Sequence, residues 1–308
     1  MSSMIDSLRH QFDLPGVTID VGNGGLPRVR IATALCSGEI YLQGAHVSAF
    51  APAGHEPVLW MSAASPFGAG KAMRGGVPIC YPWFAANARR PSAPMHGFAR
   101  TAQWELVDVG LQPGGEVNVI LRLPPQPQPS EAVDEESGIG DGSSVETYFA
   151  ALFGETLEMG LLVRNNGTRE VRFEAALHTY FTVGDVRQIS VAGLQGTRYI
   201  DKMRNDQTFI EEGPAVTFAA ETDRIYDSDA TCTIHDPLLK RRIINRKIGS
   251  GSTVVWNAFP KKAAAIGLAG DEWTGYVCVE TAAVKADAVV LGPGKAHTLG
   301  AHVSVERG

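Results

Sequence analysis

The stretch from Val171 to Phe181 reads VRFEAALHTYF, and it decides the fold class. Its odd positions are almost all apolar, and this period of two is typical of a β-strand with one face in a core. Rows with the same period lie at Val117–Leu123 and Leu157–Val163. The alternation of strands and helices that marks a parallel sheet is missing. The sequence therefore predicts an all-β protein built as an antiparallel sandwich with a few short helices.

The composition favours a folded chain and excludes some partners. Of the 308 residues, 44% are hydrophobic and 19% are charged, which is typical of a globular protein. The net charge of -6 argues against a nucleic-acid partner. No apolar run is long enough to span a membrane, so no membrane association is expected. The four cysteines are widely spaced, which fits a reducing cytoplasm.

One segment interrupts the strand pattern. The residues from Pro124 to Ser144 are rich in Pro, Ser, Gly and acidic residues and contain no Lys or Arg, so we expect a flexible surface insertion. Strands of similar character precede and follow it, which favours one domain over residues 1–308 rather than two. Short helices are expected at Ser2–Phe12 and at Lys261–Leu268.

Two loop segments carry side chains suited to chemistry. In Met73–Phe84, glycines and prolines fix a turn that presents Arg74 beside aromatic rings. Aromatic rings can pack on the apolar faces of a sugar, and an arginine can bind phosphate or hydroxyl groups. In Pro94–Arg100, His96 and Arg100 can face one cavity from even positions. The alternative interpretations are a solvated arginine and a structural histidine.

Two further residues lie on predicted strands. His178 occupies an even position of the decisive stretch and points away from its apolar face, toward either solvent or a binding surface. Glu280 ends an apolar strand, where burial would raise its pKa toward that of a general base, although a lone carboxylate at a strand end is more often solvated. No HExxH or GxSxG pattern is present, so metal-independent chemistry is the default.

Taken in order along the chain, several motifs resemble the glucose-6-phosphate 1-epimerase family of the aldose 1-epimerase superfamily. The resemblance spans nearly the whole sequence and is carried by GAHV at 44–47, KAMRGGVP at 71–78, HGFAR at 96–100, LHTYF at 177–181, ETDRIY at 221–226, VWN at 255–257 and VCVE at 277–280. It implies a galactose-mutarotase-like β-supersandwich in a single domain, with the site on a concave sheet face.

The resemblance also implies an isomerase that interconverts the α and β anomers of a hexose 6-phosphate. Glu280 would be the general base and His178 the general acid, with His96 at the ring oxygen. Arg74 and Arg100 are the implied phosphate ligands. Asp223 is the implied ligand of sugar hydroxyls. The implied partner is a small sugar phosphate, without metal or organic cofactor, bound by a monomer.

The sequence departs from the family pattern at Met95, where Gln is common, and at Thr281-Ala282, where Pro-Gly is common. Two alternatives therefore remain open. The first is a non-catalytic carbohydrate-binding module on the same fold. The second is a mutarotase for unphosphorylated aldoses.

Overall fold

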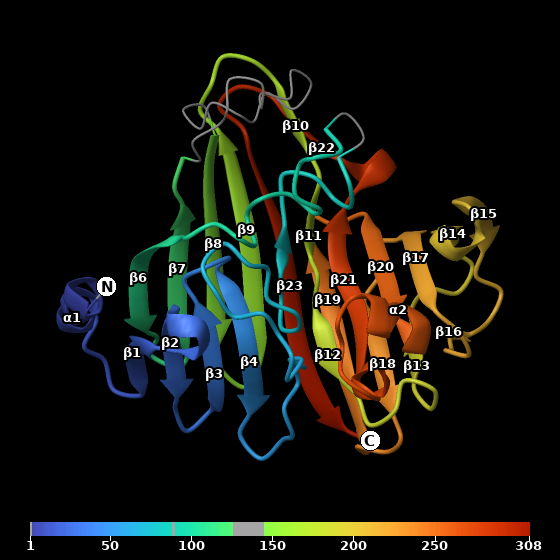
Figure 1. Ribbon diagram of the computed structural model, residues 1–308, viewed down its shortest axis with the longest axis horizontal. Coiled ribbons are helices and arrows are strands. Elements are labelled where there is room, and N and C mark those ends of the chain that lie inside the picture. The colour runs from blue at the N-terminus through green and yellow to red at the C-terminus, as the bar shows by residue number, and fades with distance from the viewer. Residues whose placement is uncertain (1, 88–89, 126–144) are drawn as a thin grey trace.

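Antiparallel strands make up most of this computed structural model, which describes residues 2–87, 90–125 and 145–308 (Figure 1). Within these residues there are two α-helices, α1 (Ser2–Gln11) and α2 (Phe259–Ala265). Short 3-10 turns lie at η1 (Asn23–Gly25), η2 (Lys202–Arg204), η3 (Glu272–Gly275) and η4 (Lys285–Asp287). No helix in the described part of the chain is long and apolar enough to cross a membrane. The predicted insertion at 124–144 lies outside the described residues beyond Pro125.

The largest sheet of the described residues has nine strands. Their order is β16 (Ala215–Val216), β13 (Ser190–Ala192), β18 (Cys232–Asp236), β19 (Arg241–Ile248), β23 (Ala296–Arg307), β9 (Leu157–Asn165), β8 (Val145–Phe153), β7 (Val117–Leu123) and β6 (Glu105–Leu111). The long strand β23 runs through the middle of the molecule and joins its two halves (Figure 1).

Two further sheets pack against the nine-stranded one. The first has the order β1 (Val17–Val21), β2 (Pro27–Ala32), β3 (Cys36–Tyr41) and β4 (His46–Pro52). The second has the order β15 (Gln207–Ile210), β14 (Arg198–Asp201), β17 (Thr222–Asp227), β20 (Ser252–Asn257), β21 (Tyr276–Ala283), β11 (Ala175–Leu177) and β5 (Ile79–Cys80), with β12 (Tyr180–Thr182) also on β21. A separate pair joins β10 (Val171–Phe173) to β22 (Val289–Leu291).

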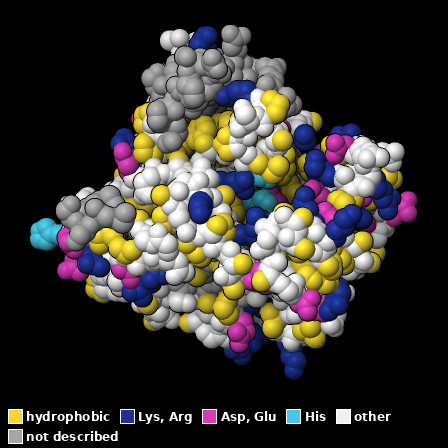
Figure 2. Space-filling view, viewed as in Figure 1, with side chains coloured by type: hydrophobic (Ala, Val, Ile, Leu, Met, Phe, Trp, Pro, Cys, Tyr) yellow, Lys and Arg dark blue, Asp and Glu magenta, His cyan; other side chains and the backbone are white. Residues whose placement is uncertain are grey.

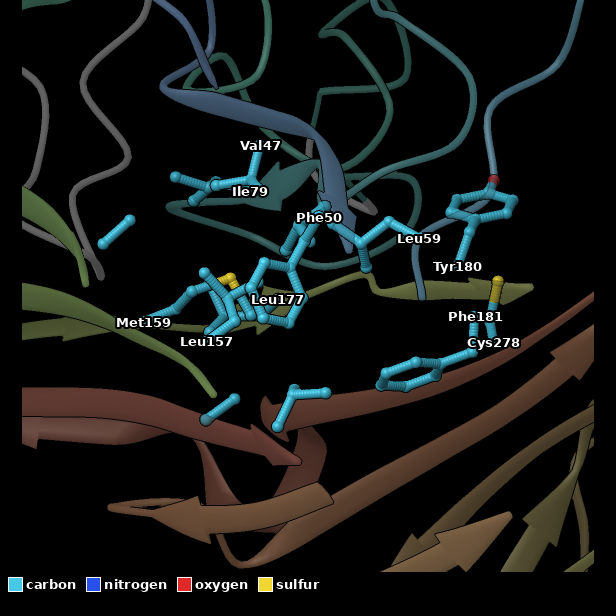
Figure 3. Close-up of a cluster of buried hydrophobic side chains, with 14 of the residues drawn as sticks. Val47, Phe50, Leu59, Ile79, Leu157, Met159, Leu177, Tyr180, Phe181 and Cys278 are labelled. Atoms are coloured by element: carbon cyan, nitrogen blue, oxygen red, sulfur yellow. The ribbon is translucent and has the colours of Figure 1, made fainter. Parts of the chain in front are cut away.

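The apolar core fills the space between these sheets. The predicted rows at Val117–Leu123 and Leu157–Val163 are strands β7 and β9, and their odd residues are buried. Apolar side chains of four strands meet at the centre of the core (Figure 3): Val47 and Phe50 from β4, Leu157 and Met159 from β9, Leu177 from β11 and Phe181 from β12. Burying such side chains stabilises the fold by about 1.5–3 kcal/mol each.

The stretch Val171–Phe181 is not one strand but three short ones, β10, β11 and β12, which belong to two sheets. The first break falls at Glu174, whose carboxylate accepts hydrogen bonds from the backbone N–H groups of Phe84 and Lys285. The second falls at His178 and Thr179, where the Thr179 N–H donates to the carbonyl of Leu177 in the same segment rather than to β21. A simple alternation of apolar and polar residues reports neither interruption.

The predicted helices are present with shifted ends. Helix α1 lies at the first predicted position, and Ile5 is buried against the sheets. Helix α2 begins at Phe259, two residues before the predicted start, because the Phe259 N–H donates to the Oδ1 of Asn257. It ends at Ala265, ahead of Gly267, which has a φ of +79°.

A buried arginine fixes β12 beneath the site. Arg241 of β19 is only 4% exposed, and its guanidinium donates hydrogen bonds to the carbonyls of Glu56, Pro57 and Thr182. Hydrogen bonds from a charged donor are stronger than neutral ones. This contact ties β12, the strand that follows His178, to the nine-stranded sheet.

Candidate active site

His178 and Glu280 are brought together by strand β21. Strand β11 pairs with β21 as far as Leu177, and β12 resumes the pairing at Tyr180. His178 lies in the gap between the two short strands, level with Glu280 of β21. The expectation that Glu280 ends its strand is wrong, because β21 continues to Ala283 through its pairing with β11. The Nε2 atom of His178 is 3.3 Å from the Oε1 atom of Glu280. The pair therefore depends on the register of three strands.

The carboxylate of Glu280 is buried without a partner. It is 0% exposed, and His178 is 9% exposed. The 3.3 Å approach lacks the geometry of a hydrogen bond, and neither oxygen of Glu280 has a hydrogen-bond donor among the described residues. An unsatisfied buried carboxyl costs stability. A side chain kept in this state is available to a ligand that enters the site.

Burial sets the protonation of the pair. It raises the pKa of Glu280 well above its usual range, helped by the negative charge of Asp223 and opposed by Arg100. It lowers the pKa of His178 well below its usual range, helped by His96 and Arg100. These directions favour a protonated Glu280 beside a neutral His178. Transfer of that one proton to Nε2 creates the carboxylate and imidazolium without changing the proton count of the pair.

His96 is a neutral hydrogen-bond donor that faces His178. Burial, with the nearby charge of Arg100, lowers the pKa of His96 to about 3. The backbone N–H of Ala85 donates to Nδ1 at 3.1 Å, so the ring proton is on Nε2. The rings of His96 and His178 meet edge to face with centroids 5.8 Å apart.

Glycine at position 97 is required to hold His96 in this place. Gly97 has a φ of +74°, and a Cβ built on it would lie 2.0 Å from the carbonyl oxygen of Tyr81. The same segment is fixed by hydrogen bonds from the Tyr81 N–H to the His96 carbonyl and from the Phe98 N–H to the Tyr81 carbonyl. The glycine in the HGFAR motif therefore serves the close approach of two backbone segments.

Arg74 and Arg100 place positive charge around the His178–Glu280 pair. Arg100 donates from Nη2 to the carbonyl of Met95 at 2.7 Å, and its charge acts on both His178 and Glu280. The charge of Arg74 acts on His178 and on Tyr180. Within the described part of the chain, no carboxylate forms an ion pair with either guanidinium. Both cations are therefore available to an anionic ligand.

The opposite wall carries Asp223, which lies on β17 across from Trp256 of β20. Burial raises the pKa of Asp223 to about 6, against the positive charges of Lys202 and Lys262. The charge of Lys202 also acts on His96, so Lys202 lies near both residues. Sequence reasoning missed Lys202 because nothing around it in the chain signals a site. Only the pairing of β14 with β17 brings η2, and with it Lys202, next to Asp223.

Aromatic side chains surround the histidine. Tyr180 stacks on the ring of His178 with centroids 4.9 Å apart and planes 10° apart, and Trp256 meets it edge to face at 5.8 Å. The sequence also indicated aromatic rings in Met73–Phe84. Of these, Phe84 contacts His96 but Trp83 packs against Phe98, so the aromatic surface beside His178 is a different one.

Together these residues line a hollow in one face of the molecule. Figure 2 shows histidine at the floor of the hollow, with Lys, Arg, Asp and Glu side chains around its rim. The structure brings together all of the site residues expected from the sequence: Arg74, His96, Arg100, His178, Asp223 and Glu280. A buried acid–base pair beside two guanidinium groups that form no ion pair with a described carboxylate can move protons on a polar, anionic substrate.

Comparisons with known proteins agree with this arrangement. The family model described as aldose 1-epimerase matches residues 27–304. A protein of Escherichia coli (strain K12) named "Putative glucose-6-phosphate 1-epimerase" is 36% identical over 243 residues, which is 78% of each chain. A solved structure from Salmonella typhimurium described as "a putative mutarotase" superposes with a TM-score of 0.85 at 30% identity, covering 99% of this chain and 100% of that one.

A galactose mutarotase-like protein from Clostridium acetobutylicum shares the fold with a TM-score of 0.70 at 13% identity, covering 95% of this chain and 98% of that chain. These similarities confirm the predicted fold and the predicted family resemblance.

Proposed function

The chain belongs to the aldose 1-epimerase family, and from this premise we propose that it interconverts the α and β anomers of glucose 6-phosphate and related hexose 6-phosphates. The observation that carries the proposal is the buried His178–Glu280 pair, 3.3 Å apart and flanked by the positive charges of Arg74 and Arg100. The name of the Escherichia coli relative supports the choice of a phosphorylated sugar.

The reaction needs two proton transfers in each direction. As the C1–O5 bond breaks, Glu280 takes the proton of the C1 hydroxyl and His178 gives a proton to O5. Rotation about C1–C2 then turns the other face of the aldehyde toward O5. On closure, His178 takes the O5 proton back and Glu280 returns its proton to O1. Each group ends the cycle in its starting state.

The electrostatics of the site favour the middle of this cycle. While the sugar is open, Glu280 is protonated and His178 is neutral, which is the state that burial favours in both side chains. Ring opening therefore moves the pair toward its preferred protonation. His96, with its proton on Nε2, donates a hydrogen bond toward the ring oxygen and stabilises the charge that develops there.

The remaining polar residues bind the substrate. Arg74 and Arg100 hold the phosphate, because a planar guanidinium can donate to two phosphate oxygens at once and stays charged. Asp223 accepts hydrogen bonds from sugar hydroxyls on the opposite wall, and Trp256 offers a ring face to the C–H groups of the sugar. Three other expectations remain predictions: a single domain over residues 1–308, a monomer and a cytoplasmic location.

The test is an exchange measurement between the two anomers. Freshly dissolved α-glucose 6-phosphate should reach its anomeric equilibrium faster with the protein than without it, as followed by polarimetry or by magnetisation transfer in NMR. Folded protein that binds the sugar phosphate without accelerating exchange would support the carbohydrate-binding alternative. Equal acceleration for glucose and glucose 6-phosphate would support a mutarotase for unphosphorylated aldoses.

A further inference from the structure

The floor of the hollow holds three side chains that can ligate a metal ion. One ligand atom each from His178, Cys278 and Glu280 lies within 4.8 Å of the other two. Cys278 and Glu280 are two residues apart on β21 and so project from the same face of the strand. His178 enters from the gap between β11 and β12. The proposed sugar chemistry uses the histidine and the glutamate but gives the cysteine no role.

The spacing of these atoms is close to that of a tetrahedral zinc site. Bonds of about 2.0–2.3 Å from Zn²⁺ to N, O and S place neighbouring ligand atoms roughly 3.4–3.6 Å apart. The His178 Nε2 and Glu280 Oε1 atoms are already 3.3 Å apart. The longest separation in the cluster, at most 4.8 Å, has to shorten by about 1 Å. Metal binding therefore requires the cysteine and glutamate side chains to rotate toward His178.

The carboxyl oxygens of Glu280 in this cluster are also available to a ligand. Both oxygens of the fully buried Glu280 lack a hydrogen-bond donor among the described residues. A mixed N, S and O donor set suits Zn²⁺ better than Mg²⁺ or Ca²⁺, which prefer oxygen. The side chain of His178 is 11% exposed, so the cluster has a path to solvent through the hollow.

Zn²⁺ binds a thiolate, a carboxylate and a neutral imidazole. Any proton on Cys278 or Glu280 is therefore released to solvent as the Zn–S, Zn–O and Zn–N bonds form.

We propose that His178, Cys278 and Glu280 form an inhibitory site for a borderline-soft divalent cation, with Zn²⁺ as the best fit. The bound ion leaves a fourth position toward the hollow for water. It also occupies the lone pairs of His178 and Glu280 that the sugar reaction needs. The inhibition, unlike the binding, rests on the proposed mutarotase function.

The binding test uses Co²⁺ as a coloured substitute for Zn²⁺. The full-length protein, freed of metal with a chelator, is titrated with Co²⁺ while near-ultraviolet absorption is recorded. A thiolate-to-cobalt charge-transfer band that saturates at one ion per chain is expected, and Zn²⁺ should displace it. Cys278→Ala should abolish the band and weaken Zn²⁺ binding by about 100-fold or more, since loss of an outer-shell partner alone costs 10- to 100-fold.

Cys80→Ala is the matched control. Cys80 is equally buried on β5, which is separated from β21 by β11, and does not belong to the cluster, so this variant should keep the band. Cys278→Ser, with a side chain of similar size, provides a second variant if the alanine protein does not fold. Absence of the band in folded wild-type protein, or its persistence in folded Cys278→Ala or Cys278→Ser, would overturn the proposal.

The inhibition test compares anomer exchange with and without Zn²⁺. Wild-type protein should lose activity on addition of Zn²⁺ and regain it with a chelator, whereas Cys278→Ala should resist the same concentration. A cobalt band in a protein that shows no exchange when metal-free would refute the proposed function and leave the metal site standing. An active protein without the band would refute the metal site alone.

Discussion

Replacing Glu280 by glutamine should lower activity and raise stability at the same time. Glu280→Gln keeps the size of the side chain but removes the group that accepts the C1 hydroxyl proton. Loss of a general base typically costs 10²- to 10⁴-fold in rate, which corresponds to about 3–5 kcal/mol in the activation barrier. We therefore expect kcat to fall by roughly that factor while the sugar phosphate still binds.

The gain in stability follows from the burial of the carboxyl. The folded protein holds the proton of Glu280 more tightly than the unfolded chain does, because burial raises the pKa. The stability contributed by this proton is present below the unfolded pKa of about 4.3 and is lost as the pH rises toward the folded pKa. The loss is up to about 1.4 kcal/mol per pH unit. Glutamine has no such proton, so the variant avoids the loss.

The assay combines urea unfolding near pH 5, 6 and 7 with anomer exchange measured by NMR. The stability of Glu280→Gln relative to wild type should increase with each step in pH. Glu306→Gln is the control, since Glu306 is about half exposed on β23 and pairs with Arg242 at the surface. That variant should change neither property. Parallel stability curves for Glu280→Gln and wild type, or full activity in the variant, would refute the reasoning.

Three further outcomes follow from the site and its supports. Arg74→Ala and Arg100→Ala should each lower kcat/KM for glucose 6-phosphate by roughly 10- to 150-fold and affect unphosphorylated glucose much less; equal losses on both sugars would contradict the phosphate role. Gly97→Ala should destabilise the protein by about 3 kcal/mol, because its Cβ would lie 2.0 Å from the Tyr81 oxygen; an unchanged melting temperature would argue against this close approach. Stability should fall as the pH is lowered from 6.5 to 5, because the unfolded chain then binds protons on histidines whose pKa burial lowers in the folded protein, to about 3 for His46. These histidines (His46, His96 and His178) outnumber the carboxyls whose pKa burial raises, Asp223 and Glu280. A urea midpoint that stays constant across that range would contradict this prediction.

The motifs of the sequence predicted candidate site residues that the structure brings together, but not why they meet. Glu280 and His178 gave weak signals taken singly, and only the order of motifs along the chain connected them. Lys202 gave no signal at all. Its place beside Asp223 follows from the pairing of β14 with β17, a contact between strands that are distant in the sequence. Trp256 lies beside His178 and Tyr180 only because β20 and β12 both pair with β21.

What the sequence determined by itself is the local periodicity. Alternation in Val117–Leu123 and Leu157–Val163 fixes which side chains of each strand face a core, because successive residues of a strand point to opposite sides. Only the tertiary structure decided that Val171–Phe181 breaks into three strands and that the register of β11 and β12 on β21 puts His178 3.3 Å from Glu280. Strand partners and register depend on contacts between segments that are far apart in the sequence, so the local pattern of one strand does not identify its partner.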